Sequence, residues 1–369
     1  MDFALASPLG GLLGWPINAM IDSQVTFGGL WMRCHRVLLI VPGIVWGLLL
    51  HCAPVSLAQE RPTILAGHGT LSGSILPLWV GAEAKLFERH GLQVKPIYLP
   101  RAAGRPALLS DDIQIYFSAG PPLVQMRLGG ADVVVTSCVV HKLTSKIMVT
   151  PAIQKVADLR GKVLAVANPG SASDFAAKLF LARQGMKPGQ DISLIYSGST
   201  SAAFAALVNG RVQAIFATSP NDLQAAQAGF KPLLELGDLN IPYAGNCSAA
   251  MRPYMTKQPA RMRSFVAGIT EAIAYIRRRP SEAKGILQKY TRVSDPSILQ
   301  HAYDSDTRYM EPVPRPTSEG TKTILENLGV SGRTAEQFVT EFNNDEFIKQ
   351  ITDEGLLKQI YPSGVPALR

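Results

Sequence analysis

Small, hydroxyl-rich segments follow the apolar runs of this 369-residue chain, at points where strands would end and helices begin. Such segments leave backbone N–H groups free at helix N-termini, where the helix dipole favours anions and polar groups. A set of them can bind a small polar or anionic ligand, although Ser and Thr at these positions also cap their own helices. The candidate ligand-binding residues are Ser72, Ser74, Arg101, Ser118, Ser137, Ser171, Ser173, Ser199, Thr200, Thr218 and Asn221.

Two arginines and one histidine have positions that suit a binding site. Arg101 and Arg105 follow the second predicted strand and are the nearest basic candidates to pair with a carboxylate or sulfonate group, but they could equally be exposed charges. His68 directly follows the first predicted strand and is a further candidate, whereas His90 lies beside a helix end, where it would interact with the dipole.

Motifs of known catalytic or cofactor chemistry are not found in the sequence. It contains no GxSxG, HExxH, CxxC or GxxxxGK[ST] pattern, and no GxGxxG between a strand and a helix. The paired acids at 111–112 and the acids Asp304 and Asp306 lack a second acid or base at a useful spacing, and we interpret them as solvated turn and helix charges. We therefore expect a binding protein with no cofactor and no metal, and no catalytic residue.

The elements that would position the candidates alternate between short apolar runs and helical patterns from Thr63 onward. Runs such as VVV, VLAVA and SLIY are continuous, which is typical of parallel strands covered by helices on both faces. Open parallel sheets bind ligands outside the carboxyl ends of their strands, so the hydroxyl-rich segments would meet in one crevice. Strands are predicted over 63–66, 93–98, 113–117, 132–136, 147–150, 163–167, 192–196 and 212–217.

Helices are predicted from apolar residues spaced by three and four. One runs from Ile75 through Trp79 to a cap at His90-Gly91, with Trp79 more suited to core packing than to ligand stacking. From residue 258 onward the pattern is helical. We therefore predict an α/β fold of two lobes, each a mainly parallel sheet flanked by helices, with 59–149 as lobe 1, 150–245 as lobe 2, and 246–369 as a return to lobe 1 followed by C-terminal helices.

The first 58 residues are predicted to be an extension and a cleaved signal peptide. The apolar run 37–50 is too short to span a bilayer comfortably, follows basic residues, and precedes small residues suited to cleavage after Ala58. Residues 1–31 contain no basic residue, so we expect translation to begin at Met32. Cys52 follows His51 where a lipobox needs a small residue, so we expect a periplasmic protein without a lipid anchor.

Composition excludes several other classes of protein. With 47% hydrophobic and 17% charged residues, the chain is neither disordered nor a coiled coil. Its net charge is +8, but no basic run exceeds the three residues at 277–279, so nucleic acid is not an expected partner. After cleavage only Cys138 and Cys247 remain, and the sequence leaves open whether they pair.

Three further segments carry a resemblance to a known family. Residues 77–80 followed by 85–94, the segment 156–163 (VADLRGKV), and the segment 205–214 (AALVNGRVQA) occur in the order found in type II periplasmic substrate-binding proteins of ABC importers. The likeness extends over most of 61–330 and resembles the branch that includes nitrate, sulfonate, taurine and thiamine-precursor binders. Individually the motifs are weak, and they do not identify a ligand.

The resemblance implies a periplasmic receptor, probably-sized as a monomer, that closes two lobes on a small, anionic organic solute such as a sulfonate, carboxylate or nitrate. Its partners would be a membrane permease and a separate ATPase subunit. Two alternatives remain: a receptor that presents its ligand to a membrane sensor, and an enzyme on the same fold. The cysteine cluster of thiamine-pyrimidine synthases and the cofactor-cysteine context of hydroxymethylbilane synthase have no counterpart here, which counts against the enzyme.

Overall fold

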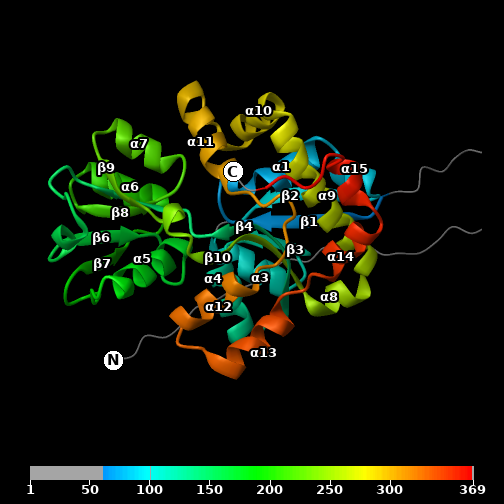
Figure 1. The fold of residues 1–369 in the computed structure, drawn as a ribbon, viewed down its shortest axis with the longest axis horizontal. Coiled ribbons are helices and arrows are strands. Elements are labelled where there is room, and N and C mark those ends of the chain that lie inside the picture. The colour runs from blue at the N-terminus through cyan, green and yellow to red at the C-terminus, as the bar shows by residue number, and fades with distance from the viewer. Residues whose placement is uncertain (1–60, 100, 368–369) are drawn as a thin grey trace, which may run out of the picture. The chain divides into compact units, whose positions relative to one another are not determined.

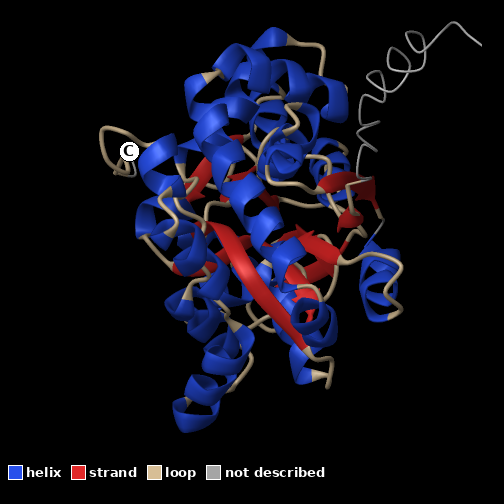
Figure 2. Ribbon diagram, turned by 90° about the vertical axis from the view of Figure 1, so that its right-hand side faces the viewer, coloured by secondary structure: helices blue, strands red, loops and turns tan. Residues whose placement is uncertain are grey.

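The computed structural model describes residues 61–99 and 101–367, which belong to a compact unit extending over Gln59–Arg369. The predicted extension, signal peptide and cleavage site lie outside the described residues. Two five-stranded sheets form the framework, each flanked by helices (Figures 1 and 2). No helix in the described part of the chain is long and apolar enough to cross a membrane.

The first sheet has the strand order β2-β1-β3-β10-β4. Strand β10 is antiparallel to both of its neighbours, while β1 pairs in parallel with β2 and β3. The strands are β1 (Thr63–His68), β2 (Gln93–Tyr98), β3 (Ile115–Ser118), β4 (Val133–Lys142) and β10 (Pro242–Met251).

The second sheet has the order β7-β6-β8-β5-β9. Here β5 is the reversed strand, since it is antiparallel to β8 and β9, whereas β6 is parallel to β7 and β8. The strands are β5 (Lys146–Val149), β6 (Val163–Val166), β7 (Ser193–Tyr196), β8 (Ala214–Ala217) and β9 (Lys231–Glu235). The predicted α/β fold with two sheets is confirmed, and each sheet is mixed.

Two crossings connect the sheets. The chain leaves the first sheet after Lys142, enters the second at Lys146, and returns between Glu235 and Pro242. The borders expected at 149/150 and 245/246 therefore lie a few residues beyond these crossings, because the short apolar strand β5 pairs with β8 and β9 instead of ending the first lobe. We use first lobe and second lobe below for the two sheets with their helices.

Helices cover both faces of the first sheet. The helical segments are η1 (Gly73–Ile75), α1 (Leu76–Glu83), α2 (Leu86–Arg89), α3 (Arg101–Leu109), α4 (Gly120–Leu128), η2 (Val156–Leu159), α5 (Ala172–Arg183), α6 (Thr200–Val208), α7 (Asn221–Gln227), η3 (Leu236–Leu239), α8 (Arg252–Lys257), α9 (Pro259–Arg278), α10 (Pro280–Thr291), α11 (Pro296–Arg308), α12 (Ser318–Asn327), α13 (Gly332–Phe342), α14 (Glu346–Asp353) and α15 (Leu356–Ile360). The predicted helix from 75 to 90 is divided into η1, α1 and α2, because Lys85 adopts a left-handed conformation with φ 55°.

The core of the first lobe includes the side chains that the helical patterns predicted to be buried. Trp79 on α1 is 0% exposed and stacks on Tyr290 with ring centroids 4.6 Å apart, which confirms its packing role. Phe265, Ile269 and Ile276 form the fully buried stripe of α9. Burial of such large apolar side chains supplies most of the free energy that holds these layers together.

A second cluster of buried apolar side chains continues from one lobe into the other. It contains residues of α4 and α12 in the first lobe and of α5 in the second. The ring of Phe175 on α5 packs against Tyr243 on β10 with centroids 5.4 Å apart. The lobes are therefore in apolar contact on this side of the molecule.

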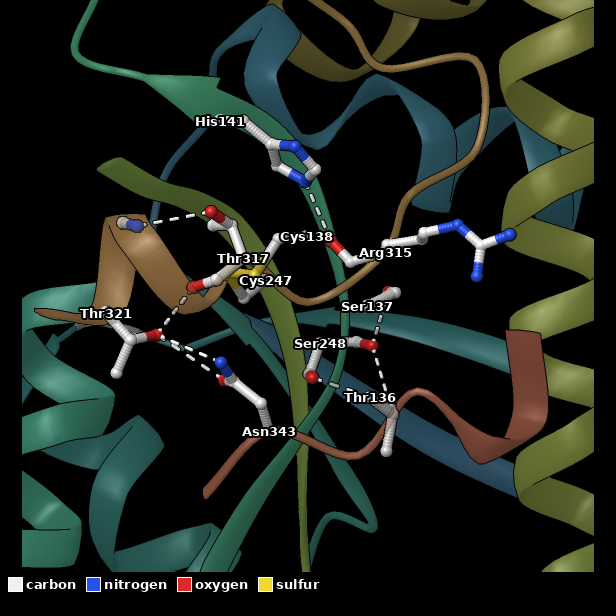
Figure 3. The surroundings of a disulfide bond; sticks show 11 residues. Thr136, Ser137, Cys138, His141, Cys247, Ser248, Arg315, Thr317, Thr321 and Asn343 are labelled. Carbon is white, nitrogen blue, oxygen red and sulfur yellow. Dashed lines mark hydrogen bonds between the residues drawn. A yellow bond between two sulfur atoms is a disulfide. The ribbon is translucent and has the colours of Figure 1, made fainter. Parts of the chain in front are cut away.

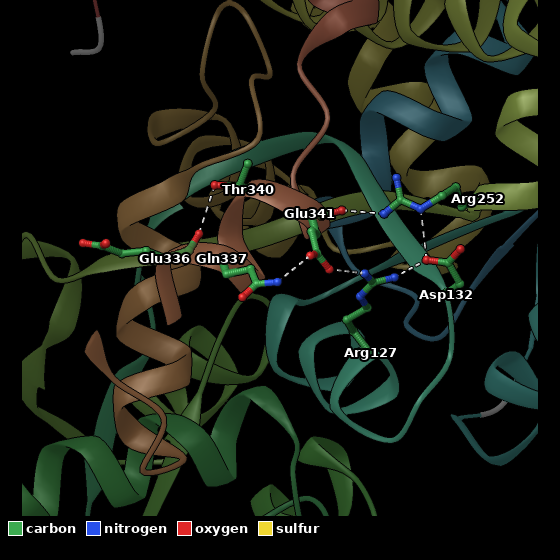
Figure 4. A network of polar contacts seen from close by, with 7 residues as sticks. All are labelled: Arg127, Asp132, Arg252, Glu336, Gln337, Thr340 and Glu341. Carbon is green, nitrogen blue, oxygen red and sulfur yellow. Dashed lines mark hydrogen bonds and ion pairs between the residues drawn. The ribbon is translucent and has the colours of Figure 1, made fainter. Parts of the chain in front are cut away.

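A polar network fixes the C-terminal helices to the first sheet (Figure 4). Arg127 of α4 bonds Asp132 and donates to Glu341 Oε2 of α13 over 2.9 Å. Arg252 of α8 donates to Asp132 Oδ1 over 3.0 Å and to the backbone oxygen of Glu341 over 2.7 Å. Partial burial would raise the pKa of Asp132, but the hydrogen bonds from Arg252 and Arg127 outweigh it and lower that pKa.

Candidate functional site

A cavity of about 990 Å³ lies between the two lobes. The first lobe contributes the segment after β1, the end of β3, part of β10, and α11, and the second lobe contributes the segments after β6, β7 and β8. Residues 143–145 of one crossing also line it. The ends of strands from both sheets thus meet around one space, as expected for ligand sites in open α/β sheets.

Nine of the predicted ligand-binding residues line this cavity. They are Ser72, Ser74, Ser118, Ser171, Ser173, Ser199, Thr200, Thr218 and Asn221. Arg101 begins α3, and its side chain is outside the described part of the structure. Arg105 is exposed and does not line the cavity.

Ser137 is not brought to the cavity. It is 0% exposed, and its Oγ lies 2.7 Å from Ser248 Oγ on the neighbouring strand β10 (Figure 3). The prediction placed Ser137 at the end of a strand, but β4 continues to Lys142. Ser137 is therefore inside the sheet, where it satisfies a buried hydroxyl group beside the disulfide of Cys138 and Cys247.

Several of the cavity hydroxyls already cap helices. Ser171 Oγ accepts from Asp174 N over 3.1 Å at the start of α5, and Ser199 Oγ accepts from Ala202 N over 3.0 Å at the start of α6. Asp174 Oδ2 also accepts from the N–H of Gly170. Because these N-termini are partly satisfied by their own side chains, the capping interpretation holds here, and fewer free N–H groups face the cavity than the sequence suggested.

His68 has a structural position. Its side chain is buried, does not line the cavity, and accepts or donates at Nδ1 to the oxygen of Thr70 over 2.9 Å. Trp79 Nε1 donates to His68 Nε2 over 3.3 Å. Burial lowers the pKa of His68, which favours the neutral ring that can accept this bond.

An ion pair bridges the lobes at one end of the cavity. Asp222 of α7 is 4% exposed, and its Oδ2 lies 3.0 Å from Nε2 of His301 on α11 and 3.1 Å from Nζ of Lys146 on β5. Burial alone would raise the pKa of Asp222, but His301 and Lys146 outweigh it and lower that pKa. Asp222 is therefore ionised, and its charge connects the second lobe to α11 of the first.

A second bridge involves Glu235 at the end of β9. Tyr309 donates from its hydroxyl to Glu235 Oε1 over 3.3 Å, and Arg308 Nη1 lies 4.0 Å from the same oxygen. Lys146 Nζ lies 3.7 Å from Glu235 Oε2. Lys142 Nζ is placed over the Tyr309 ring, 4.6 Å from its centroid, and donates to Asn240. The three cations of the cavity wall thus already have partners.

Asp306 corrects a prediction. It was interpreted as a solvated helix charge, but its Oδ2 is buried and has no hydrogen-bond partner among the described residues. Burial first, and the charge of Asp222 second, raise the pKa of Asp306 to about 8, an effect that the N–H of Gly73 partly offsets. A Cβ on Gly73 would lie 2.3 Å from Asp306 Oδ2, so this glycine permits the carboxyl group to pack against η1.

The β8–α7 segment supplies two further buried polar groups. Ser219 is 6% exposed, and its Oγ has no hydrogen-bond partner within the described part of the chain. Asn221 is 8% exposed, and its side-chain amide likewise forms no hydrogen bond to the residues that the structure describes. Both residues line the cavity. Buried polar groups are nearly always paired, so groups left unpaired in a cavity wall are suited to a ligand.

Sequence reasoning missed the charged residues of the site. Asp222 and Ser219 adjoin the predicted Thr218 and Asn221, and this proximity was a usable signal. Asp306 and His301 gave none, because they lie on a polar helix of the tail whose return to the cavity depends on tertiary packing. Within 61–99 and 101–367, no group of three or more His, Cys, Asp or Glu side chains is arranged to hold a metal ion.

Comparison with known proteins agrees with this geometry. Residues 73–283, more than half of the chain, match the family model described as NMT1/THI5 like. No sequence among the curated proteins matches significantly.

Solved structures show the fold. The periplasmic aliphatic sulphonate-binding protein SsuA from Escherichia coli is 23% identical, with a TM-score of 0.64 over 76% of this chain and 92% of that one. The periplasmic nitrate-binding protein NrtA from Synechocystis PCC 6803 is 15% identical, with a TM-score of 0.68 over 83% and 92%. A DszB variant in complex with biphenyl-2-sulfinic acid is 16% identical, with a TM-score of 0.56 over 80% and 99%. The chain therefore has the fold of periplasmic binding proteins.

Proposed function

Because the chain belongs to the NMT1/THI5-like family, we propose that it is the periplasmic solute-binding component of an ABC importer. It binds one small organic solute between its lobes and delivers it to a membrane permease that is driven by a separate ATPase subunit. It acts as a monomer, reaches the membrane only through the permease, and uses no covalent chemistry.

The division of the cavity wall between the lobes carries this proposal. Each lobe supplies part of the lining, and two short crossings connect the lobes. A solute bound to one lobe of an open molecule makes only part of its contacts, whereas closure completes them. The solute therefore favours the closed state by the free energy of the contacts from the second lobe.

Side chains that remain available for a solute lie on both lobes. Ser118 at the end of β3 belongs to the first lobe, while Thr200 and Thr218 belong to the second. None of these three hydroxyls forms a side-chain hydrogen bond to another described residue. They support a solute with several polar atoms. The anionic group expected from the sequence, and the candidate residues as ligand contacts, stay predictions.

Thermal unfolding tests the proposal. Protein purified from an exporting host, with its disulfide intact, is stripped of solute by unfolding and refolding, then heated with sulfonates, nitrate, carboxylates, pyrimidines and amines. Solute at about a hundred times its Kd adds roughly 2.7 kcal/mol, which raises the midpoint by a few degrees. Native mass spectrometry of the unstripped protein detects a solute that the panel lacks.

Two tryptophan variants locate the binding site. Ser118→Trp fills the cavity and should abolish the thermal shift, while Ser331→Trp, at the exposed start of α13, should leave it unchanged. A folded wild-type protein with no shift and no co-purified small molecule would contradict a solute-binding role. A shift that persists in Ser118→Trp would place the solute outside this cavity.

A further inference from the structure

Asp306, Asn221 and Ser219 gather at the end of the cavity where α7 meets α11. Asp222, next to Asn221 in the chain, bonds His301 on α11, and its charge acts on Asp306 two turns along the same helix region. The three polar groups therefore lie on the two sides of the bridge between the lobes. All three residues line the cavity.

The charges at this end are unevenly satisfied. Lys146 is paired with Asp222 and Glu235, and Arg308 lies near Glu235. Asp306, by contrast, forms no ion pair in the described part of the chain, and one of its carboxyl oxygens has no hydrogen-bond partner. A bare anion placed here would approach carboxyl groups and would find no unpaired cation. An ammonium or another N–H donor would supply the partner that the carboxyl group lacks.

Asn221 gives a second, independent indication of a ligand. More than nine-tenths of this residue is buried, yet its amide has no partner among the described residues and lines the cavity. A side-chain amide combines an acceptor oxygen with two N–H donors, so it can orient a polar nitrogen group that Asp306 attracts by charge. Gly73 holds the opposite side of Asp306 in place, because only a residue without Cβ leaves room for the carboxyl group.

Resting on the proposed function, we propose that the imported solute carries a basic nitrogen, which binds between Asp306 of the first lobe and Asn221 of the second. Contact with both lobes makes this nitrogen part of the closure mechanism as well as a determinant of specificity. A protonated amine also requires Asp306 to be ionised. Binding near neutral pH therefore releases the proton that the buried carboxyl group otherwise retains.

The test compares probes that differ only in an amino group. Binding of 2-aminoethanesulfonate against ethanesulfonate, and of benzylamine against benzyl alcohol, is measured by calorimetry in two buffers of different ionisation enthalpy. The wild-type protein should bind the amine of a recognised pair at least about tenfold more tightly, with release of up to about one proton. Asp306→Asn should lose both the preference and the proton release.

Controls and outcomes separate this inference from the proposed function. Asp353→Asn, which removes an exposed charge at the end of α14, should keep the preference, and Asp306→Ser replaces Asp306→Asn if that variant does not fold. Equal binding of both members of a pair, or a preference that survives in the Asp306 variants, would overturn this inference and leave solute binding intact. If no probe binds, a co-purified solute is identified by mass spectrometry: a basic nitrogen in it supports the inference, and its absence overturns it. A protein with neither bound probe nor co-purified solute contradicts the proposed function itself.

Discussion

Neutralisation of Asp306 should make the solute-free protein more stable, by an amount that grows with pH. The change is Asp306→Asn, which keeps the size of the side chain and removes its charge. Burial raises the pKa of this carboxyl group from 3.8 to about 8. Between these values the folded protein retains a proton that the unfolded chain has already lost.

The direction and size of the effect follow from this difference in bound protons. One extra proton on the folded state lowers the free energy of unfolding by about 1.4 kcal/mol for each unit that the pH rises. The wild-type protein should therefore lose stability relative to Asp306→Asn from about pH 4, with the loss levelling off above about pH 8. Below the unfolded pKa both states are protonated, and the contribution of this group is fully present.

Neighbouring groups that titrate in the same range do not obscure the comparison. Asp222, His301, Glu235 and Asp304 line the same cavity and are present in both proteins, so their direct contributions cancel in the difference. Lys146 remains charged throughout. Asp353→Asn removes an exposed carboxylate and should give a curve parallel to that of the wild type.

Urea unfolding at pH 5, 6, 7 and 8, monitored by fluorescence, measures these free energies. Trp79, buried in α1, reports loss of the core of the first lobe. The difference between the wild type and Asp306→Asn should change by more than about 2 kcal/mol over this interval. A constant difference across the four pH values would refute the reasoning, because it would mean that the carboxyl group ionises normally in the folded protein.

Three other predictions use the same measurements. Gly73→Ala should destabilise the protein by about 1–3 kcal/mol, because its Cβ would meet the Asp306 carboxyl group, and most of this loss should disappear when it is combined with Asp306→Ser. Replacement of Cys138 and Cys247 by Ser should cost about 2–4 kcal/mol in oxidised protein, and a reductant should lower the wild-type midpoint but not that of the variant. Asp132→Asn should lower the unfolding midpoint at pH 7, with the difference vanishing as the pH falls through the lowered pKa of Asp132, since the wild-type carboxylate is then protonated too.

The sequence predicts the architecture well where hydrophobic patterns are continuous. Strand β2 has the predicted bounds, and the buried stripe of α9 has the predicted residues, because apolar periodicity reports burial directly. Strand β10 reads PYAGNCSAAM, with glycine, asparagine and small residues, so its central place in the sheet was not predicted. Its burial comes from neighbours on both sides, which a local pattern does not contain.

The candidate site divides in the same way. Ser118, Thr218 and Asn221 were found because strand ends can be recognised along the chain and parallel strands bring their ends together. Ser137 failed because the length of β4 is set by its pairing with β10. Asp306 lies on an exposed-looking helix, and only the packing of α11 against η1 buries its carboxyl oxygen.

The order in which the chain emerges during synthesis and export gives the disulfide a further consequence. Cys138 and Cys247 are 109 residues apart, and the whole second sheet is formed by the chain between them. The second lobe is continuous in sequence and can fold once its own residues are available, whereas the first sheet is incomplete until β10 inserts between β3 and β4. The bridge can therefore form only after the second lobe has crossed the membrane, and its oxidation records that both crossings have been made in the native order.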